Sequence, residues 1–343
     1  MSIRSLLTCL LAVVALGAAA APAGAFMIGV HDDDAFVSAP APVRRAAFDR
    51  AQSIGARWLR VNMVWQGYRD LGLAPYARAV NEARRRGMRV ELTLTGNPSY
   101  VNGGSGYVAR MPNVARYARW IGSVARRLRG RVYAYGIWNE PNLGMFFLPQ
   151  GAAGQRHYAR LYRAAYRAVR RADPRAKILI GETAPSNKPL RFLAAVARGG
   201  LRADGWAHHP YQFANVAPGR PEPRHLGISN TAAMRRGMAA LARRGLLRTP
   251  AGKPLPIYFT EFGYPRRGSL FGIFSEPTRA DYSVRALRLA RRAGAQVMVW
   301  YQVFNPEPVA HGNLWDTGLV GRDGSESLVY RRLRAGRRAL AAR

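Results

Sequence analysis

Residues 132–142 read VYAYGIWNEPN, an apolar and aromatic run that ends on an amide and a carboxylate, Asn139 and Glu140. The first seven residues have the length and the β-branched and aromatic content of a buried strand. An Ala- and Arg-rich run over residues 155–171 follows, with the apolar spacing of an amphipathic helix. The stretch therefore predicts a strand–helix unit with Glu140 where the strand ends.

The same alternation repeats along the chain. The expected strands are 26–30, 58–65, 89–95, 132–138, 178–181, 205–209, 257–261 and 296–303. The expected helices are 43–54, 75–86, 114–128, 155–171, 190–197, 231–244, 279–292 and 326–341. This order predicts a single (β/α)8 TIM barrel over residues 26–343. A doubly wound open sheet is the alternative, but the first strand is followed by Asp32, Asp33 and Asp34 and not by a glycine-rich phosphate-binding loop.

Residues 1–25 have the features of a cleavable signal peptide. Arg4 precedes an apolar run over residues 6–20, and Ala-Gly-Ala at 23–25 offers a small-residue cleavage site. The apolar run is too short to span a bilayer comfortably, and no later segment predicts stable membrane insertion. The only cysteine, Cys9, lies in this segment, so we expect an exported, extracellular chain without disulfides.

The composition is strongly basic, with 53 Lys and Arg against 19 Asp and Glu and a formal charge of +34. Arginine runs at 84–86, 126–127 and 243–244 fall on expected helices, where solvated helix faces are the favoured interpretation. The alternative is attraction to an anionic glycan or cell-wall polymer. No nucleic-acid-binding motif accompanies the charge, and no His/Asp/Glu set has metal-ligand spacing. We therefore expect neither a nucleic-acid partner, nor a metal, nor a cofactor.

Polar and aromatic side chains gather where the expected strands end, which is where barrels of this kind form their sites. They are Arg60, Asn62, Trp65, Asn97, Asn139, Glu140, Glu182, His208, His209, Tyr211, Glu261, Trp300 and Gln302. Glu140 ends the fourth strand and Glu261 the seventh, so the two carboxyl groups should face one another across the barrel mouth. Two carboxyl groups about 5–5.5 Å apart suit hydrolysis of a glycosidic bond by double displacement.

The motifs Asn139-Glu140-Pro141 and Glu261-Phe262-Gly263 resemble those of the retaining glycoside hydrolases of the (β/α)8 4/7 superfamily, clan A. The resemblance is closest to the cellulase-like family 5 and the xylosidase-like family 39, and it extends over residues 26–343. The expected fold is thus that of a glycoside hydrolase catalytic domain. The family pattern gives no role to Glu182, to the acidic triplet 32–34 or to the arginine excess.

The resemblance implies a role for each matching residue. The implied roles are general acid/base for Glu140, nucleophile for Glu261, support of the nucleophile for Arg60, binding of the sugar 2-hydroxyl for Asn139, the sixth-strand His-x-Tyr pair for His209 and Tyr211, and the floor of the cleaved-sugar subsite for Trp300. Because His208 and His209 must point to opposite faces of a strand, only one of them can face the site, and His209 is expected to do so.

These observations predict a secreted retaining O-glycoside hydrolase that acts on a β-linked glycoside or polysaccharide. A non-catalytic protein on the same fold, which binds a glycan or an anionic cell-wall polymer, is the alternative, because fold alone does not fix function.

Overall fold

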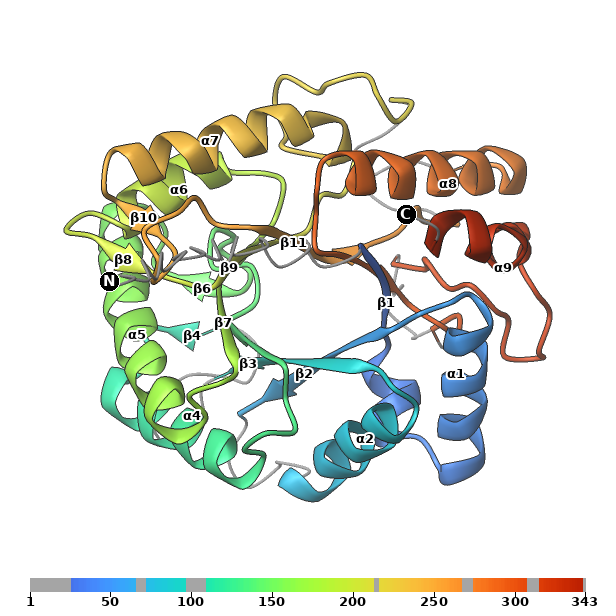
Figure 1. Ribbon diagram of the computed structural model, residues 1–343, viewed down its shortest axis with the longest axis horizontal. Helices are drawn as coiled ribbons and strands as arrows, with labels where there is room; N and C mark the ends of the chain where they lie inside the picture. The colour runs from blue at the N-terminus through green and yellow to red at the C-terminus, as the bar shows by residue number, and fades with distance from the viewer. Residues whose placement is uncertain are drawn as a thin grey trace, which may run out of the picture.

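The computed structural model describes residues 26–65, 72–96, 109–212, 216–266, 274–306 and 315–341. Within these ranges eight parallel strands close into a barrel in the order β1-β12-β11-β9-β7-β5-β3-β2, and helices surround it (Figure 1). The barrel strands are β1 (Met27–His31), β2 (Trp58–Val64), β3 (Arg89–Thr95), β5 (Ala134–Ile137), β7 (Lys177–Thr183), β9 (Gly205–His208), β11 (Ile257–Phe262) and β12 (Val297–Tyr301). The predicted single (β/α)8 barrel is confirmed.

The helices that cover the barrel follow the expected order. They are α1 (Ala41–Ser53), α2 (Leu73–Arg85), α4 (Val114–Arg127), α5 (Gly151–Ala172), α6 (Pro189–Val196), α7 (Thr231–Arg243), α8 (Glu276–Arg292) and α9 (Leu328–Ala341). Short elements that the sequence did not predict join them: a π-helix η1 (Asp34–Ser38), a 3-10 helix η3 (Ile228–Asn230), and the two-residue pairs β4 (Ala109–Arg110) with β6 (Phe147–Leu148) and β8 (Leu201–Arg202) with β10 (Leu247–Arg248). None of the described helices is long and apolar enough to cross a membrane.

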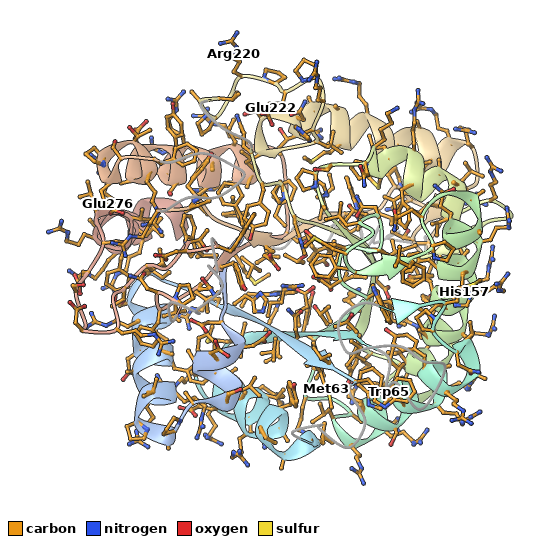
Figure 2. All side chains as sticks on the ribbon, turned by 180° about the vertical axis from the view of Figure 1, so that it is seen from behind. Met63, Trp65, His157, Arg220, Glu222 and Glu276 are labelled. Carbon is orange, nitrogen blue, oxygen red and sulfur yellow. The ribbon has the colours of Figure 1, made fainter. Side chains whose placement is uncertain are left out.

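Several of the arginines lie in the last turns of helices. The last turn of α2 holds Arg84 and Arg85, that of α4 holds two more arginines, and that of α8 holds Arg291 and Arg292. Cations in this position interact favourably with the negative end of the helix dipole. Figure 2 shows blue-tipped side chains pointing outward around the rim of the molecule, as the labelled Arg220 does on its loop.

Each barrel strand presents two different faces. On β2, Leu59 and Val61 belong to the core between strands and helices, whereas Trp58 belongs to a separate apolar cluster inside the barrel. The alternation of strand side chains therefore turns Arg60 and Asn62 to the inside, above Trp58. Inside the barrel, a layer of polar side chains thus lies at the C-terminal ends of the strands, above the apolar cluster that contains Trp58.

Candidate active site

Two carboxyl groups from opposite sides of the barrel meet at His209. The Nδ1 atom of His209 lies 2.8 Å from Oε1 of Glu140, just after β5, and 3.9 Å from Oε2 of Glu261 on β11. These two distances place the two carboxylate oxygens no more than 6.7 Å apart. The phenol of Tyr211 donates to Oε1 of Glu261 at 3.0 Å, which fixes the orientation of that carboxylate.

The surroundings shift the pKa values of the two glutamates in opposite directions. Burial favours the neutral form of Glu261, but the cations His209 and Arg60 outweigh it and hold the pKa of Glu261 at about 2. Burial raises the pKa of Glu140 above its ordinary value, against the lowering effect of the hydrogen bond from His209. Burial would lower the pKa of His209, but the charge of Glu261, the hydrogen bond to Glu140 and the nearby carboxylate of Glu182 raise it to about 9. At neutral pH Glu261 is therefore ionised and His209 is cationic, and the raised pKa of Glu140 makes it the better proton donor of the two glutamates.

Arg60 is the hub of the polar layer and is completely buried. Its Nη1 donates to Oε2 of Glu261 at 2.8 Å, and its Nη2 donates to Oδ1 of Asn139 at 2.9 Å. Nη1 also lies 2.7 Å from Nδ1 of His31. Because a guanidinium only donates hydrogen bonds, this His31 nitrogen must be the acceptor, and the imidazole proton belongs on Nε2, where Asp33 lies 3.2 Å away.

The backbone is strained where the polar layer is built. Trp138 and Glu140 both have left-handed φ angles, 71° and 43°, and flank Asn139. Non-glycine residues in this region cost about 1–3 kcal/mol each and occur where the surroundings over-determine them. Here the strain turns both Asn139 and Glu140 toward the barrel mouth, where Arg60 and His209 hold their side chains.

His209 faces the two glutamates and His208 faces outward. The imidazole of His208 lies 2.7 Å from the carbonyl oxygen of Leu226 and 2.9 Å from Oγ1 of Thr183, and its ring lies against Trp206. Burial lowers the pKa of His208 to about 3, so it is neutral.

The structure contradicts the expected place of Trp300. This residue pairs with Val30, which belongs to the core between strands and helices, and its indole donates to the carbonyl oxygen of Thr317 at 3.0 Å. The next residue, Tyr301, pairs with His31, and the two rings lie 4.9 Å apart. Because neighbouring strand residues point to opposite faces, Tyr301 takes the inward place that the sequence analysis gave to Trp300.

Buried polar side chains that the sequence analysis left without a role complete the layer. Glu182 on β7 and Thr93 on β3 both contact Arg60, and Thr93 donates to Glu182 at 2.7 Å. Glu91 on β3 accepts from the indole of Trp58 at 3.0 Å, and burial raises its pKa to about 8, so it is protonated at neutral pH. The sequence pattern that could have pointed to Glu91 is an acidic residue in the middle of an otherwise largely apolar strand. Asn97 lies outside the described residues.

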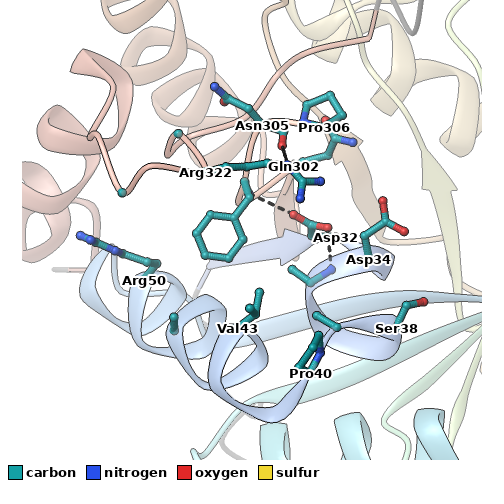
Figure 3. Close-up of a pocket in the computed structure, with 16 residues that line it drawn as sticks. Asp32, Asp34, Ser38, Pro40, Val43, Arg50, Gln302, Asn305, Pro306 and Arg322 are labelled. Atoms are coloured by element: carbon teal, nitrogen blue, oxygen red, sulfur yellow. Dashed lines mark hydrogen bonds between the residues drawn. The ribbon is translucent and has the colours of Figure 1, made fainter. Parts of the chain in front are cut away.

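Two residues of the acidic triplet, Asp32 and Asp33, accept hydrogen bonds from the backbone. Asp32 accepts from the backbone of Ala35 at 3.0 Å and of Phe304 at 3.0 Å, which ties the end of β1 to the segment after β12. It borders a cavity of about 530 Å3 between α1 and that segment (Figure 3). Asp33 accepts from the backbone of Asn62 at 2.8 Å. Neither catalytic candidate lines this cavity. In the described part of the chain, no three His, Cys, Asp or Glu side chains gather as metal ligands.

Solved structures with this architecture are numerous. A family 39 glycoside hydrolase from Bacteroides cellulosilyticus WH2 superposes with a TM-score of 0.73 at 18% identity, over 93% of this chain and 65% of that one. A monomeric β-xylosidase from Caulobacter crescentus CB15 gives 0.66 at 17%, over 90% and 67%. An exo-β-1,4-mannosidase from Opitutaceae bacterium strain TAV5 gives 0.62 at 17%, over 92% and 60%. The chain thus spans about two thirds or less of their lengths, and at these identities the likeness shows the fold.

The sequence comparisons identify the family. No curated protein matches the sequence. The model of the cellulase family, glycosyl hydrolase family 5, matches residues 29–229, which is more than half of the chain. The matched segment includes Arg60, Asn139, Glu140, His209 and Tyr211. This protein therefore belongs to the cellulase family, glycosyl hydrolase family 5.

Proposed function

We propose that the protein is a retaining O-glycoside hydrolase that cleaves a β-linked glycoside or polysaccharide, with Glu140 as general acid/base and Glu261 as nucleophile. The observation that carries the proposal is the pair of buried carboxyl groups that share His209 and have pKa values shifted in opposite directions. The shared contact with His209 keeps one oxygen of each glutamate within 6.7 Å of the other, a bound that includes the spacing of about 5–5.5 Å found in retaining enzymes.

The reaction has two steps. Glu261 attacks the anomeric carbon while the glycosidic bond breaks, and Glu140 gives its proton to the departing oxygen. A glycosyl ester on Glu261 and an ionised Glu140 remain. Glu140 then takes a proton from water, whose oxygen attacks the same carbon and releases Glu261. Two displacements at one carbon retain its configuration.

The neighbouring residues suit supporting roles. His209 donates to Oε1 of Glu140, which leaves Oε2 as the oxygen that carries the transferable proton. Arg60 and Tyr211 each hold one oxygen of Glu261, so its orientation is fixed before substrate binds. Asn139 accepts from Arg60 through its oxygen, which turns its amide nitrogen away from Arg60 as a donor for a sugar hydroxyl. Tyr301, and not Trp300, is the aromatic residue that we assign to the sugar-facing wall.

Azide rescue tests the two roles. In Glu261→Ala, azide should attack an activated dinitrophenyl β-glycoside in one displacement and give an azido-sugar of inverted configuration. In Glu140→Ala, the glycosyl-enzyme still forms with this leaving group, and azide should give an azido-sugar of retained configuration. Glu82→Gln, on the outer helix α2, is the control that should keep wild-type turnover. Full activity in either alanine variant would refute the assignment.

We further propose that residues 1–25, which lie outside the described residues, direct export and are then removed. The chain secreted by an expression host should begin at Phe26 when its N-terminus is sequenced. A secretion-competent chain that keeps Met1 would contradict this.

A second candidate function is binding of an anionic glycan or cell-wall polymer. A groove of about 330 Å3 between α5 and α6 is lined by Arg156, Arg160, Arg163 and Arg198 and by no acidic residue. Binding of the Glu261→Gln protein to an acidic polysaccharide, with an affinity that falls steeply as salt rises and without hydrolysis by the wild type, would favour this candidate.

A further inference from the structure

Glu182 is buried beneath the two catalytic candidates and contacts both of the cations that face them. Its Oε2 accepts from Nη2 of Arg60 at 2.5 Å and from Nε of Arg60 at 3.1 Å. The same oxygen lies 3.7 Å from Nε2 of His209, a buried atom that has no hydrogen-bond partner among the described residues. Arg60 contacts Glu261 and His209 contacts Glu140. The carboxylate of Glu182 therefore lies beside both of the cations that contact the catalytic candidates.

A bulge in β7 brings Glu182 into the barrel. The register of β7 against β9 shifts between Gly181 and Thr183, and Glu182 is the extra residue at that point. Gly181 pairs with the inward Ala207, and Thr183 pairs with the outward His208. Strict alternation would turn Glu182 outward with the helices, but the bulge and its left-handed φ of 41° turn it inward.

Gly136 on β5 supplies the space that Glu182 fills. A Cβ atom at position 136 would lie 1.6 Å from Oε1 of Glu182. The Glu182 side chain passes from β7 over β5 to reach Thr93 on β3 and Arg60 on β2. A glycine on the strand that is crossed is therefore a steric requirement for the contact.

We propose that Glu182 is a positioning residue that holds Arg60 against Glu261 and keeps His209 protonated beside Glu140. This inference rests on the proposed function for its catalytic consequence. Without Glu182, the two cations Arg60 and His209 would share Glu261, which lies 2.8 Å from Arg60 and 3.9 Å from His209. As the shared counter-anion, Glu182 balances them.

The titration of His209 depends on groups from several strands. They are Glu140 after β5, Glu182 on β7, Glu261 on β11, Arg60 on β2, Glu91 on β3 and the neutral His208 on its own strand. Burial of Glu182 opposes its ionisation, but Arg60 and His209 keep its pKa below the ordinary value. Glu182 therefore contributes a negative charge at neutral pH, whereas Glu91 does not.

Glu182→Gln tests the charge while keeping the shape. The chain has six histidines, so NMR can follow the titration of His209 directly once a His209→Gln spectrum has assigned its signal. We expect the midpoint of His209 to fall from near 9 toward its ordinary value, because an adjacent anion is lost. The basic limb of kcat/KM should move to lower pH, and kcat should fall by up to about 100-fold with a smaller change in KM.

Glu91→Gln is the matched control, since it removes a buried carboxyl group that is protonated at neutral pH and accepts from Trp58. Because Glu91 ionises near pH 8, below the His209 midpoint, its loss should lower that midpoint, but by less than the loss of Glu182, which lies 3.7 Å from His209. The positioning role is refuted if Glu182→Gln and Glu91→Gln give the same His209 midpoint. Because that midpoint is measured without substrate, the result stands apart from the azide experiment: a shifted midpoint in a protein without turnover would refute the proposed function alone.

Gly136→Ala displaces Glu182 without altering any charged group. We expect it to shift the His209 midpoint in the same direction as Glu182→Gln. In the Glu182→Gln background, the added Gly136→Ala should shift the midpoint little further, since both changes act on one contact. Fully additive shifts would show that Gly136 acts by another route and would overturn the steric part of the inference. Circular dichroism and thermal melting confirm that each variant is folded.

Discussion

Removal of Arg60 should destabilise the protein strongly, and removal of Glu182 as well should restore part of the loss. Arg60→Met leaves the fully buried Glu182 without its cation, for which a cost of about 3–5 kcal/mol is expected. Glu182→Gln alone removes the charged partner of a pair and should cost about 1–3 kcal/mol. The double variant contains neither buried charge. Its cost should therefore fall short of the sum by roughly 2 kcal/mol, a coupling typical of residues in one buried network.

Together with the wild type, the two single variants and the double variant form a double-mutant cycle. Urea unfolding at pH 7, followed by the fluorescence of the seven tryptophans, measures the free energy of unfolding of all four proteins. Arg44→Met and Glu82→Gln form the matched control cycle. That ion pair joins α1 and α2 at 3.2 Å in a partly exposed position and should show a coupling of about 0–1 kcal/mol. Activity should not recover with stability, because Glu261 has lost Arg60 in the double variant. Additive costs in the Arg60–Glu182 cycle would refute the view that the two charges depend on one another.

Further outcomes follow from the same geometry. Glu140→Ala should reduce turnover of glycosides with poor leaving groups by about 10²–10⁴-fold, and a dinitrophenyl glycoside should show a burst of release followed by slow turnover. The pKa of His209 is raised, so the stability that its protonation contributes is fully present below pH 6.5 and is lost as pH rises through about 9. The loss should amount to up to about 3 kcal/mol of unfolding free energy. Unfolding midpoints of the wild type and of His209→Gln at pH 6 and pH 9.5 measure this loss. Trp300→Phe should lower the free energy of unfolding by about 1–3 kcal/mol and leave KM unchanged, whereas Tyr301→Ala should raise KM. A raised KM in Trp300→Phe with an unchanged KM in Tyr301→Ala would show that Trp300, and not Tyr301, faces the inside of the barrel.

The barrel could be predicted because each unit repeats the same two signals. Apolar runs of strand length and Ala/Arg-rich amphipathic runs alternate, and a closed parallel sheet is a fold that buries both faces of such strands. The sequence also placed Arg60 inside correctly, since Leu59 and Val61 on either side are apolar and belong to the outer face. Where one strand carries clear alternation, its inward residues can be read from the sequence.

Trp300 and Tyr301 show where such reading fails. Both are aromatic, both end the same strand, and a shift of one residue exchanges the faces of a strand. The register with β1 resolves the choice, because Val30 pairs with Trp300 and His31 with Tyr301. That register depends on barrel closure between the first and the last strand, which no local pattern contains.

The role of Glu182 was missed for a different physical reason. The sequence contains the charge, the cation Arg60 and the empty position Gly136, but they lie on strands separated by 46 to 122 residues of chain, and the strand order β7-β5-β3-β2 alone brings them together. Local alternation even points Glu182 the wrong way, because a bulge reverses its side. A carboxylate at a bulge, opposite a strand glycine and within reach of an inward arginine, is therefore a pattern to seek across strands rather than along one. In this barrel the pattern leads to Glu182 beneath the two catalytic candidates, a residue to which its strand-end position alone gave no role.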